Sequence, residues 1–430
     1  MERLRFVLVA GLFALSLVPG AARAGWMLDG IPLTPPWSSA AYAAVSSDGA
    51  SGEIVAFQAC YLGVMKILVQ RIDSNGAVLW PSSGIALGAG SFPAIISDGA
   101  GGTIIVWEID RGYGLDIYAQ RIDADGSPLW AENGVPVCSA SGDQSQALIC
   151  PDASGGAVVA WWDNRGGESA IFAQRIDGEG LALWAADGVP VCTVAGEKLR
   201  MRIASLGMDG AVIAWEDSRG ASFSNIYAQR LDTAGAIQWT ADGVAVCPTA
   251  SAQLLPRVAP DGSGGAIIAW MDTRRWSDIY AQRISASGAA EWTADGVRIC
   301  DSPSYQWMPD ILGDGAGGAI VTWSGGEGDL DIRAQRLDSD GAVQWSSTGV
   351  TVCAATGSQT APSLVSDGSG EAIVIWADER NGEADVYAQR IDASGIALWT
   401  PDGVAIVTAG GEQSSRWIVS DGDAGAIVTW

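Results

Sequence analysis

The chain has 430 residues, is 48% hydrophobic and only 17% charged, and contains 56 glycines and 20 tryptophans. This composition is typical of many short apolar strands joined by glycine turns, and it argues against a disordered chain. The formal net charge of −25 argues against nucleic acid and anionic membrane surfaces as partners, because both repel an acidic protein.

The N-terminal segment 1–24 is predicted to be a secretory signal peptide. Arg3 and Arg5 precede an apolar run over 6–18, and small residues at Ala22 and Ala24 suit a cleavage site. The run is shorter than the ~20 residues of a transmembrane helix, and glycines and aspartates interrupt every later apolar run. We therefore expect a mature chain over 25–430 that is secreted, periplasmic or bound at the cell surface, with no transmembrane segment.

The mature chain repeats two signatures along its length. Copies of "IYAQRIDADGSPLW" place an arginine at spacings of 50, 54, 55, 53, 53 and 54 residues. These arginines are Arg71, Arg121, Arg175, Arg230, Arg283, Arg336 and Arg390. The second signature is a glycine turn before an apolar run that ends in an aromatic residue, as in "DGAGGTIIVW". A fixed period of this length indicates a repeat architecture.

Each repeat divides into four strand-length pieces in chain order. Strand a is a short run such as "PSLVSD", and strand b resembles "AIVAW", which is apolar on both faces and therefore expected to be covered on both. Strand c is "DIYAQRID", bounded by tight-turn sequences, and strand d is the "LW" piece that runs on into "GVPVC". No stretch shows helical periodicity, so we predict an all-β fold.

Four short antiparallel strands repeated about every 53 residues predict a β-propeller of four-stranded blades in a single domain over 25–430. The segment 25–33, "GWMLDGIPL", matches strand d, and the chain ends with copies of strands a and b. We expect eight blades, the last one built from both ends, with its c strand missing from a sequence that stops short. A seven-bladed ring with surplus strands is the alternative.

Most forms of site chemistry are excluded by the residues that the sequence lacks. There is no histidine, which removes Ser-His-Asp and Cys-His catalysis and His-ligated zinc. CxxC, a Walker loop and a dinucleotide fingerprint in a βαβ unit are absent, and "DADG" lacks the spacing of a calcium loop. We predict no metal, no cofactor and no catalytic residue that can be selected.

Two tryptophans outside the repeated positions are candidates for ligand binding. Trp276 in "RRWSD" and Trp307 in "SYQWMPD" both fall in predicted loops. Stacking on a sugar or an aromatic ligand is possible there, whereas the recurrent tryptophans of strands b and d are expected to pack between blades.

A "WxDxR" segment follows strand b in four repeats. Its charged pairs are Asp163 and Arg165, Asp217 and Arg219, Asp272 and Arg274, and Asp378 and Arg380. After Trp107 the motif is shifted by one residue, and after Trp323 it is lost. The pairs could form a ring of loops that binds a polar ligand, or they could fix the b–c connection by local hydrogen bonds and ion pairing; the second interpretation is favoured.

The recurrent Gln-Arg pair is predicted to be a structural clamp used once per blade. Strand side chains alternate between faces, so an arginine covered by neighbouring blades needs a carboxylate or several carbonyl partners. For Arg283, the expected suppliers are Asp278 or the "WxDxR" aspartates.

The seven cysteines are expected to be buried free thiols. Five of them close the "GVxVC" segments, and equivalent positions of successive repeats usually lie too far apart for a disulfide. Cys138 and Cys150 are the one pair close enough in sequence to deserve a test.

The motif "YAQRIDADGSPLW" is similar to the repeat of quinoprotein-type (PQQ-like) propellers, in which a strand ending in an acidic turn and Gly runs into a Trp. The resemblance covers the c–d half of each repeat and implies an eight-bladed propeller of the exported bacterial type. The quinone-dependent dehydrogenases of that family carry adjacent cysteines, a calcium-binding carboxylate cluster and a catalytic Asp. This chain has no adjacent cysteines and no residue that matches the others, so the resemblance implies the fold without the cofactor.

Two functions remain open. The first is a non-enzymatic binding or scaffold module, expected to be a monomer, with an unknown protein or glycan ligand. The second is an enzyme acting on polysaccharide or alcohol substrates at the channel mouth, which should concentrate unusual polar residues in two or three blades. Only the segment 324–331 and the regions of Trp276 and Trp307 depart noticeably from the repeat.

Overall fold

The computed structural model describes residues 4–7, 33, 40–61, 63–219, 223–408, 410–411, 413 and 417–430. Among these residues the only helix is a short 3-10 turn, η1 (Gly207–Asp209), and all other regular structure is β-strand. The all-β prediction is confirmed. The chain divides into two compact units, unit 1 (Met1–Pro190 with Ser414–Trp430) and unit 2 (Val191–Gln413).

Unit 1 contains four-stranded sheets built from consecutive strands. The first has the order β2 (Ala40–Ser47), β3 (Glu53–Tyr61), β4 (Val64–Ile72) and β5 (Ile85–Ala89). The second has β6 (Ser91–Ser97), β7 (Thr103–Asp110), β8 (Leu115–Ile122) and β9 (Val135–Cys138). The third has β10 (Gln144–Pro151), β11 (Ala157–Asp163), β12 (Ala170–Ile176) and β13 (Val189–Cys192), whose last strand contains the unit boundary.

Unit 1 also contains the C-terminal strands. β30 (Trp417–Ser420) pairs antiparallel with β31 (Ala426–Thr429), as predicted for strands a and b of a last blade. The third strand of this sheet is β1 (Leu4–Val7), which runs parallel to β31. β1 falls within the predicted signal peptide, and the rest of 1–24 lies outside the described residues. The segment 25–33, predicted to supply strand d, is described only at Leu33.

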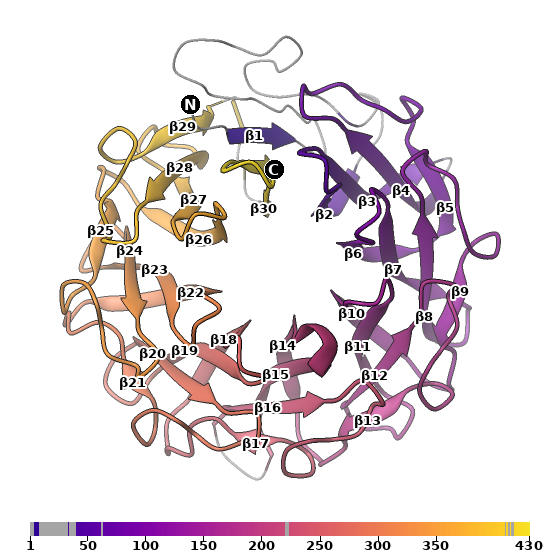
Figure 1. Ribbon diagram of the computed structural model, residues 1–430, viewed down its shortest axis with the longest axis horizontal. Coiled ribbons are helices and arrows are strands. Elements are labelled where there is room, and N and C mark those ends of the chain that lie inside the picture. The colour runs from indigo at the N-terminus through magenta and orange to yellow at the C-terminus, as the bar shows by residue number, and fades with distance from the viewer. Residues whose placement is uncertain are drawn as a thin grey trace. The chain divides into compact units, whose positions relative to one another are not determined.

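Unit 2 repeats the same sheet four times. The first two sheets are β14 (Lys198–Ser205), β15 (Ala211–Asp217), β16 (Asn225–Leu231), β17 (Val244–Ala245), and β18 (Gln253–Pro260), β19 (Ala266–Asp272), β20 (Asp278–Ile284), β21 (Val297–Arg298). The other two are β22 (Tyr305–Gly313), β23 (Ala319–Gly326), β24 (Asp331–Leu337), β25 (Val350–Cys353), and β26 (Gln359–Ser366), β27 (Ala372–Asp378), β28 (Asp385–Ile391), β29 (Val404–Val407). Figure 1 shows these sheets one after another along the chain.

Each four-stranded sheet is an antiparallel meander in which neighbours in sequence are neighbours in space. Within a unit, the first strand of one sheet contacts the first and second strands of the sheet before it, as β18 contacts β14 and β15. Stacked meanders of this kind are the blades of a β-propeller. We keep the word blade for each sheet, and letters a to d for its strands.

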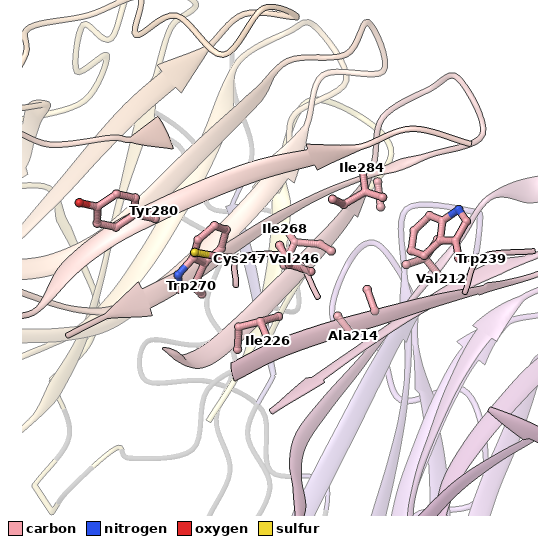
Figure 2. Close-up of a cluster of buried hydrophobic side chains, with 12 residues drawn as sticks. Val212, Ala214, Ile226, Trp239, Val246, Cys247, Ile268, Trp270, Tyr280 and Ile284 are labelled. Atoms are coloured by element: carbon pink, nitrogen blue, oxygen red, sulfur yellow. The ribbon is translucent and has the colours of Figure 1, made fainter. Parts of the chain in front are cut away.

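The b strands are buried on both faces, as their composition predicts. Every residue of β15 and of β27 is buried, whichever face of the strand its side chain belongs to. Between the sheets of β14–β17 and β18–β21 lies one apolar layer that includes Ile226, Ile268 and Trp270. Figure 2 shows Trp270 and Trp239 toward opposite ends of this layer.

Every complete a strand contains a β-bulge at the same position. The pairing of β18 with β19 shifts between Leu254 and Arg257, and Leu255 inside the bulge has φ 57°. A left-handed residue other than glycine is uncommon, and here it lets one extra residue enter the strand. The same position is left-handed at Tyr42, Phe92, Gln146, Arg200, Met308 and Ala361.

One detail of the predicted strands is wrong. The tryptophan of the "LW" piece does not belong to strand d, because Trp292 lies in the c–d connection and β21 begins only at Val297. An isolated bridge between Ile284 and Ala290 keeps this connection against the end of strand c.

Candidate functional site

The "WxDxR" segments hold each aspartate inside its blade. Asp272 is buried at the end of β19 and accepts hydrogen bonds from Trp270 Nε1 at 3.1 Å and from Arg274 Nη2 at 2.5 Å. Arg274 Nη2 also donates to the carbonyl oxygen of Asp295 at 3.0 Å and contacts Cys247 Sγ at 2.9 Å. We call this set of a buried tryptophan, an aspartate and an arginine the tryptophan lock.

The lock recurs with the same geometry in three other blades. Its members are Trp161, Asp163 and Arg165, then Trp215, Asp217 and Arg219, then Trp376, Asp378 and Arg380. In all four locks the guanidinium carbon also lies about 4 Å from the ring centre of an aromatic residue of strand c, as at Tyr280 (4.0 Å). The carboxylates are buried, so the contacts of these pairs are made within the blade.

In two other blades the tryptophan of strand b has no lock, and these tryptophans show what the lock supplies. The buried indole N–H groups of Trp107 and Trp323 have no hydrogen-bond partner among the described residues. Trp107 is followed by the shifted motif, and Trp323 by "SGGEGD". Leaving such a donor unsatisfied costs about 1–3 kcal/mol. The main effect of the lock is therefore to give the buried indole N–H a hydrogen-bond acceptor.

The lock also fixes the charge of its aspartate. Burial alone would raise the pKa of Asp272, but hydrogen bonds from Arg274 and Trp270 hold this pKa below its usual value. The pKa values of Asp217 and Asp378 are lowered in the same way. These carboxylates are therefore ionised at neutral pH and are not placed to donate a proton.

The cysteines are free thiols in the structure, and six of the seven are buried. Burial raises the pKa of Cys138 to about 12 and that of Cys353 to about 12, so neither forms the thiolate that a nucleophile needs. Cys138 and Cys150 form no disulfide, since both are buried free thiols, and Cys60 is exposed.

The glutamine of each Gln-Arg pair closes the c–d connection of its own blade. Gln282 Nε2 donates to the carbonyl oxygen of Thr293 at 2.9 Å, and its Oε1 accepts from the backbone N–H groups of Arg283 at 3.1 Å and Trp292 at 3.0 Å. The equivalent amides of Gln70, Gln120, Gln174, Gln229, Gln335 and Gln389 each donate to a carbonyl oxygen eleven residues further on.

The arginine of the pair joins its blade to the next one. Arg283 Nε donates to Asp261, in the a–b turn, at 2.9 Å, and its Nη1 donates to the carbonyl oxygen of Ser339, in the next blade, at 3.3 Å. Trp292 Nε1 donates to that same carbonyl oxygen at 2.9 Å. We call this arrangement the interblade clamp. It occurs also at Arg71 with Asp48 and Ala124, and at Arg121 with Asp98 and Gly178.

The expected partner of this arginine is wrong. Asp278 is held by Arg298 at 3.0 Å, and the lock aspartates are held by their own arginines, so neither supplies the carboxylate. The aspartate of the a–b turn does, as at Arg175 with Asp152 and at Arg390 with Asp367. Arg230 is the exception, because Leu206 replaces that aspartate, and it donates to the carbonyl oxygens of Asp209 and Ala286.

One clamp is looser than the others. Arg336 lies 3.7 Å from Asp314, and its Nη1 lies 3.5 Å from the carbonyl oxygen of Ala393. A hollow of about 570 Å³ opens beside it, lined also by Gln344 and Trp345. Of the arginines singled out from the sequence, Arg336 alone lines this hollow.

The two candidate tryptophans both lie in unit 2, next to residues that are hydrogen-bonded to each other. Trp276 lies in the loop between β19 and β20 and is 72% exposed, and Trp307 is 49% exposed. Their chain neighbours are bonded to each other. Gln306 N donates to the carbonyl oxygen of Ser277 at 2.9 Å, and Ser277 Oγ donates to the carbonyl oxygen of Gln306 at 2.7 Å. These two hydrogen bonds tie the Trp276 loop to the a strand of the next blade.

The prediction that Trp307 falls in a loop is wrong. Trp307 lies in β22, directly before the bulge at Met308, whose φ is 53°. The bulge keeps the segment paired with β23 although Pro309 follows, because register is restored at Asp310. Trp307 pairs with Ser324 and Asp310 with Thr322, and residues two apart on a strand share a face. Trp307 and Asp310 therefore belong to one face of the blade.

A second group of residues in unit 2 was missed from the sequence. It occupies one position of the a strand, just after the bulge and four residues before the a–b turn begins; we call it the variable position. In unit 2 the variable position holds Arg202, Arg257, Asp310 and Ser363, whereas in unit 1 it holds Ala44, Ala94 and Leu148. Counting back from each a–b turn would have revealed this change in the sequence.

The side chains at the variable position contact one another across neighbouring a strands. Arg257 Nε lies 3.3 Å from Asp310 Oδ1, and Asp310 Oδ2 accepts from Ser363 Oγ at 2.9 Å and from the Leu364 N–H at 3.2 Å. Arg202 is half-buried, and its Nη1 donates to the carbonyl oxygen of Met201 at 2.8 Å. Burial and the nearby charge of Arg257 lower the pKa of Arg202 to about 10.

Within the described residues, no three side chains of His, Cys, Asp or Glu are grouped so that they could hold a metal ion. None of the described helical residues forms a segment long and apolar enough to cross a membrane.

No protein-family model matches the sequence, and neither does any curated protein. Among solved structures, a lectin from Burkholderia pseudomallei is similar over 85% of this chain and 99% of its own, with a TM-score of 0.55 and 13% identity. The β-propeller domain of a protease from Pyrococcus furiosus is similar over 85% of this chain and 99% of its own, with a TM-score of 0.46 and 9% identity. The likeness to the lectin shows the fold of this chain, a β-propeller.

Proposed function

We propose that this chain is an exported, monomeric, non-enzymatic β-propeller of eight blades that binds a saccharide at the a strands of unit 2. The blade number rests on the seven four-stranded sheets together with the sheet of β30 and β31. Export rests on the predicted leader over 1–24, and the PQQ-like character on the resemblance of the c–d repeat.

One observation carries the proposed site. Trp276 and Trp307 are two exposed tryptophans of unit 2, and their chain neighbours Ser277 and Gln306 are hydrogen-bonded to each other. Exposed aromatic rings offer apolar faces to the C–H side of a sugar ring, and adjacent polar groups can bind its hydroxyls. Asp310, on the same face of β22 as Trp307, is partly exposed and supplies such a group.

The charged residues of the locks and clamps are occupied by contacts that hold the blades rigid. We therefore do not assign them to ligand binding. The lock aspartates are buried and their arginines are 16–25% exposed, so a ligand would have to displace contacts on which the blade depends. The charged pairs from Asp163 to Arg380 are therefore assigned to the support and the tryptophans to the site. The lectin neighbour is compatible with glycan binding, although at 13% identity it is similar only in fold.

A glycan array with the mature chain tests the proposal, followed by calorimetric titration of the strongest hit. Trp276→Ala and Trp307→Ala should each weaken binding by about tenfold or more, which corresponds to about 1.4 kcal/mol. Tyr113→Ala is the matched control, because Tyr113 is 84% exposed in unit 1 and removing it should leave affinity unchanged.

Two results would contradict the proposal. If no saccharide on the array binds, or if the tryptophan variants bind as well as the unchanged chain, the site is not the one proposed. Release of new reducing ends from a bound oligosaccharide would show an enzyme acting on polysaccharide instead of a binding module.

A further inference from the structure

We propose that the saccharide bound by this chain is acidic, and that its carboxylate is recognised by Arg202 and Arg257 on the neighbouring strands β14 and β18. This inference rests on the proposed saccharide-binding function. It states that the residues at the variable position determine whether the chain prefers acidic or neutral saccharides.

The two arginines occupy equivalent places. Arg202 pairs in register with Ala214 of β15, and Arg257 with Ala269 of β19, and β14 and β18 contact each other. The repeat therefore sets the two arginines at equivalent positions of adjacent strands. Repetition of the fold does not require this arrangement, because the same position in unit 1 is filled by Ala94 and Leu148.

The carboxylates near the pair are already engaged. Arg200 Nη1 donates to both oxygens of Glu216, at 3.1 and 2.9 Å, and Glu216 Oε1 also accepts from the Leu255 N–H at 2.6 Å. Asp310 is shared between Arg257 and the Ser363 hydroxyl. Among the described residues, no carboxylate lies within ion-pair distance of Arg202.

The group of Arg200, Arg202 and Arg257 keeps an uncompensated positive charge and unused N–H donors. Within the described part of the chain, Arg200, Arg202 and Arg257 face two carboxylates, Glu216 and Asp310. This leaves an excess of one positive charge in a chain whose formal net charge is −25. A guanidinium has five N–H donors, and Arg202 uses Nη1 on a single carbonyl oxygen. Burial, and after it the charge of Arg257, lowers the pKa of Arg202, and an anion between the two guanidinium groups would relieve the repulsion between them.

The size of the excess charge selects the ligand. One uncompensated positive charge matches a single carboxylate, and the planar guanidinium fork suits its two oxygens. A polysulfated saccharide has several negative charges, and the net negative charge of this protein would repel it. A uronic acid or another sugar acid with one carboxylate per residue fits this charge, and Arg257 is linked through Asp310 to β22, the strand that carries Trp307.

The test uses oligosaccharides of uronic acids, each paired with its carboxyl-reduced form, in which the carboxylate becomes a CH₂OH group and the sugar is otherwise unchanged. Binding to the mature chain is measured by calorimetry at low and at physiological ionic strength. We expect the acidic form to bind at least about tenfold more tightly than the reduced form. This preference should shrink with added salt, because the pair is partly exposed.

Arg202→Gln and Arg257→Gln should each reduce the preference for the acidic form toward equal binding, while binding of the reduced form stays nearly unchanged. The control is Arg111→Gln, which removes the same charge from a 39% exposed arginine of unit 1 and should keep the preference. Circular dichroism melting of each variant separates a loss of recognition from a loss of folding.

The outcomes distinguish this inference from the function on which it rests. If acidic and reduced sugars bind equally and Trp307→Ala weakens both, the saccharide site stands and the carboxylate assignment is wrong. Tighter binding of sulfated than of carboxylated oligosaccharides would overturn the assignment as well. If no sugar of any charge binds, the proposed function itself fails.

Discussion

The two units share one framework and differ along their first strands. The tryptophan lock of Asp163 in unit 1 has the same contacts as that of Asp272 in unit 2. At the variable position, by contrast, unit 1 has small or apolar residues such as Ala94 and Leu148, and unit 2 has Arg202 and other polar residues. Residues that keep the same partners from blade to blade serve the fold, and a position whose residues change on an unchanged backbone is free to serve a ligand.

At the bulge position the side chains also vary, but not by unit, because the polar Gln146 lies in unit 1 and the apolar Leu255, Met308 and Ala361 lie in unit 2. In unit 1, the bulge residues Tyr42 and Phe92 form an edge-on aromatic pair with ring centres 4.5 Å apart. In unit 2, the bulge residue Arg200 binds Glu216. Both sets adopt the same left-handed backbone, with φ between 49° and 51°, so the contrast lies in the side chains alone.

The largest effect is expected from breaking the lock in either unit. Asp163→Ala and Asp272→Ala each leave a buried tryptophan N–H and a partly buried arginine without their carboxylate, which should cost about 3–5 kcal/mol of unfolding free energy. Chemical denaturation of both variants measures this. Nearly equal losses of unfolding free energy in the two variants would support a framework shared by both units. A loss in only one variant would show that the lock does not serve the two units alike.

Acid should weaken the framework next. The pKa values of Asp217, Asp272 and Asp378 are lower in the folded chain than usual, so the folded state holds these protons less tightly than the unfolded state. Their contribution is fully present above the ordinary aspartate pKa of about 4 and is lost as pH falls below it. The unfolding free energy should therefore decrease below about pH 4, with a smaller decrease for Asp272→Ala. An unchanged slope in that variant would contradict the assignment.

The interblade clamp is expected to contribute less than the lock. Arg283→Met removes hydrogen bonds to Asp261 and to the next blade, which should lower the unfolding free energy by about 1–3 kcal/mol. Arg336→Met, at the looser clamp with its 3.7 Å separation, should cost no more than about 1 kcal/mol. Thermal melting of the two variants provides the comparison. If Arg283→Met left the melting temperature unchanged and abolished ligand binding, the Gln-Arg pair would be part of a ligand-binding site and not a structural clamp.

The repeat made the framework predictable from the sequence. The all-β fold, the order of the four strands and the burial of strand b follow from periodicity, because every copy places the same residues in the same environment. The partner of Arg283 was not predictable, since Asp261 approaches it only through the pairing of β18 with β19 and β20. The sequence predicts a loop at Trp307, because no sequence rule shows that a bulge keeps "QWMPD" in a strand.

The candidate site was predictable only in part. Trp276 and Trp307 depart from the repeat and can be singled out one by one, but the hydrogen bonds between their neighbours Ser277 and Gln306 are visible only in the structure. The variable position was visible as a change of residue type at a fixed distance from the a–b turn. That residues at this position contact one another could not be inferred from the sequence. The ion pair between Arg257 and Asp310 shows it, and this pair joins strands separated by about one repeat.

The smallest effect on stability, and the sharpest test of the comparison, is expected from Arg202→Leu, which gives unit 2 the residue that unit 1 has at Leu148. Arg202 has one hydrogen bond to a backbone carbonyl and is repelled by Arg257, so its replacement should change the unfolding free energy by no more than about 0.5 kcal/mol. The preference for acidic over carboxyl-reduced oligosaccharides should nevertheless disappear. Leu148→Ala is the matched control, and it should leave this preference intact. A large loss of stability in Arg202→Leu would show that the arginine serves the fold, and the distinction between a shared framework and a variable binding position would then not hold at this residue.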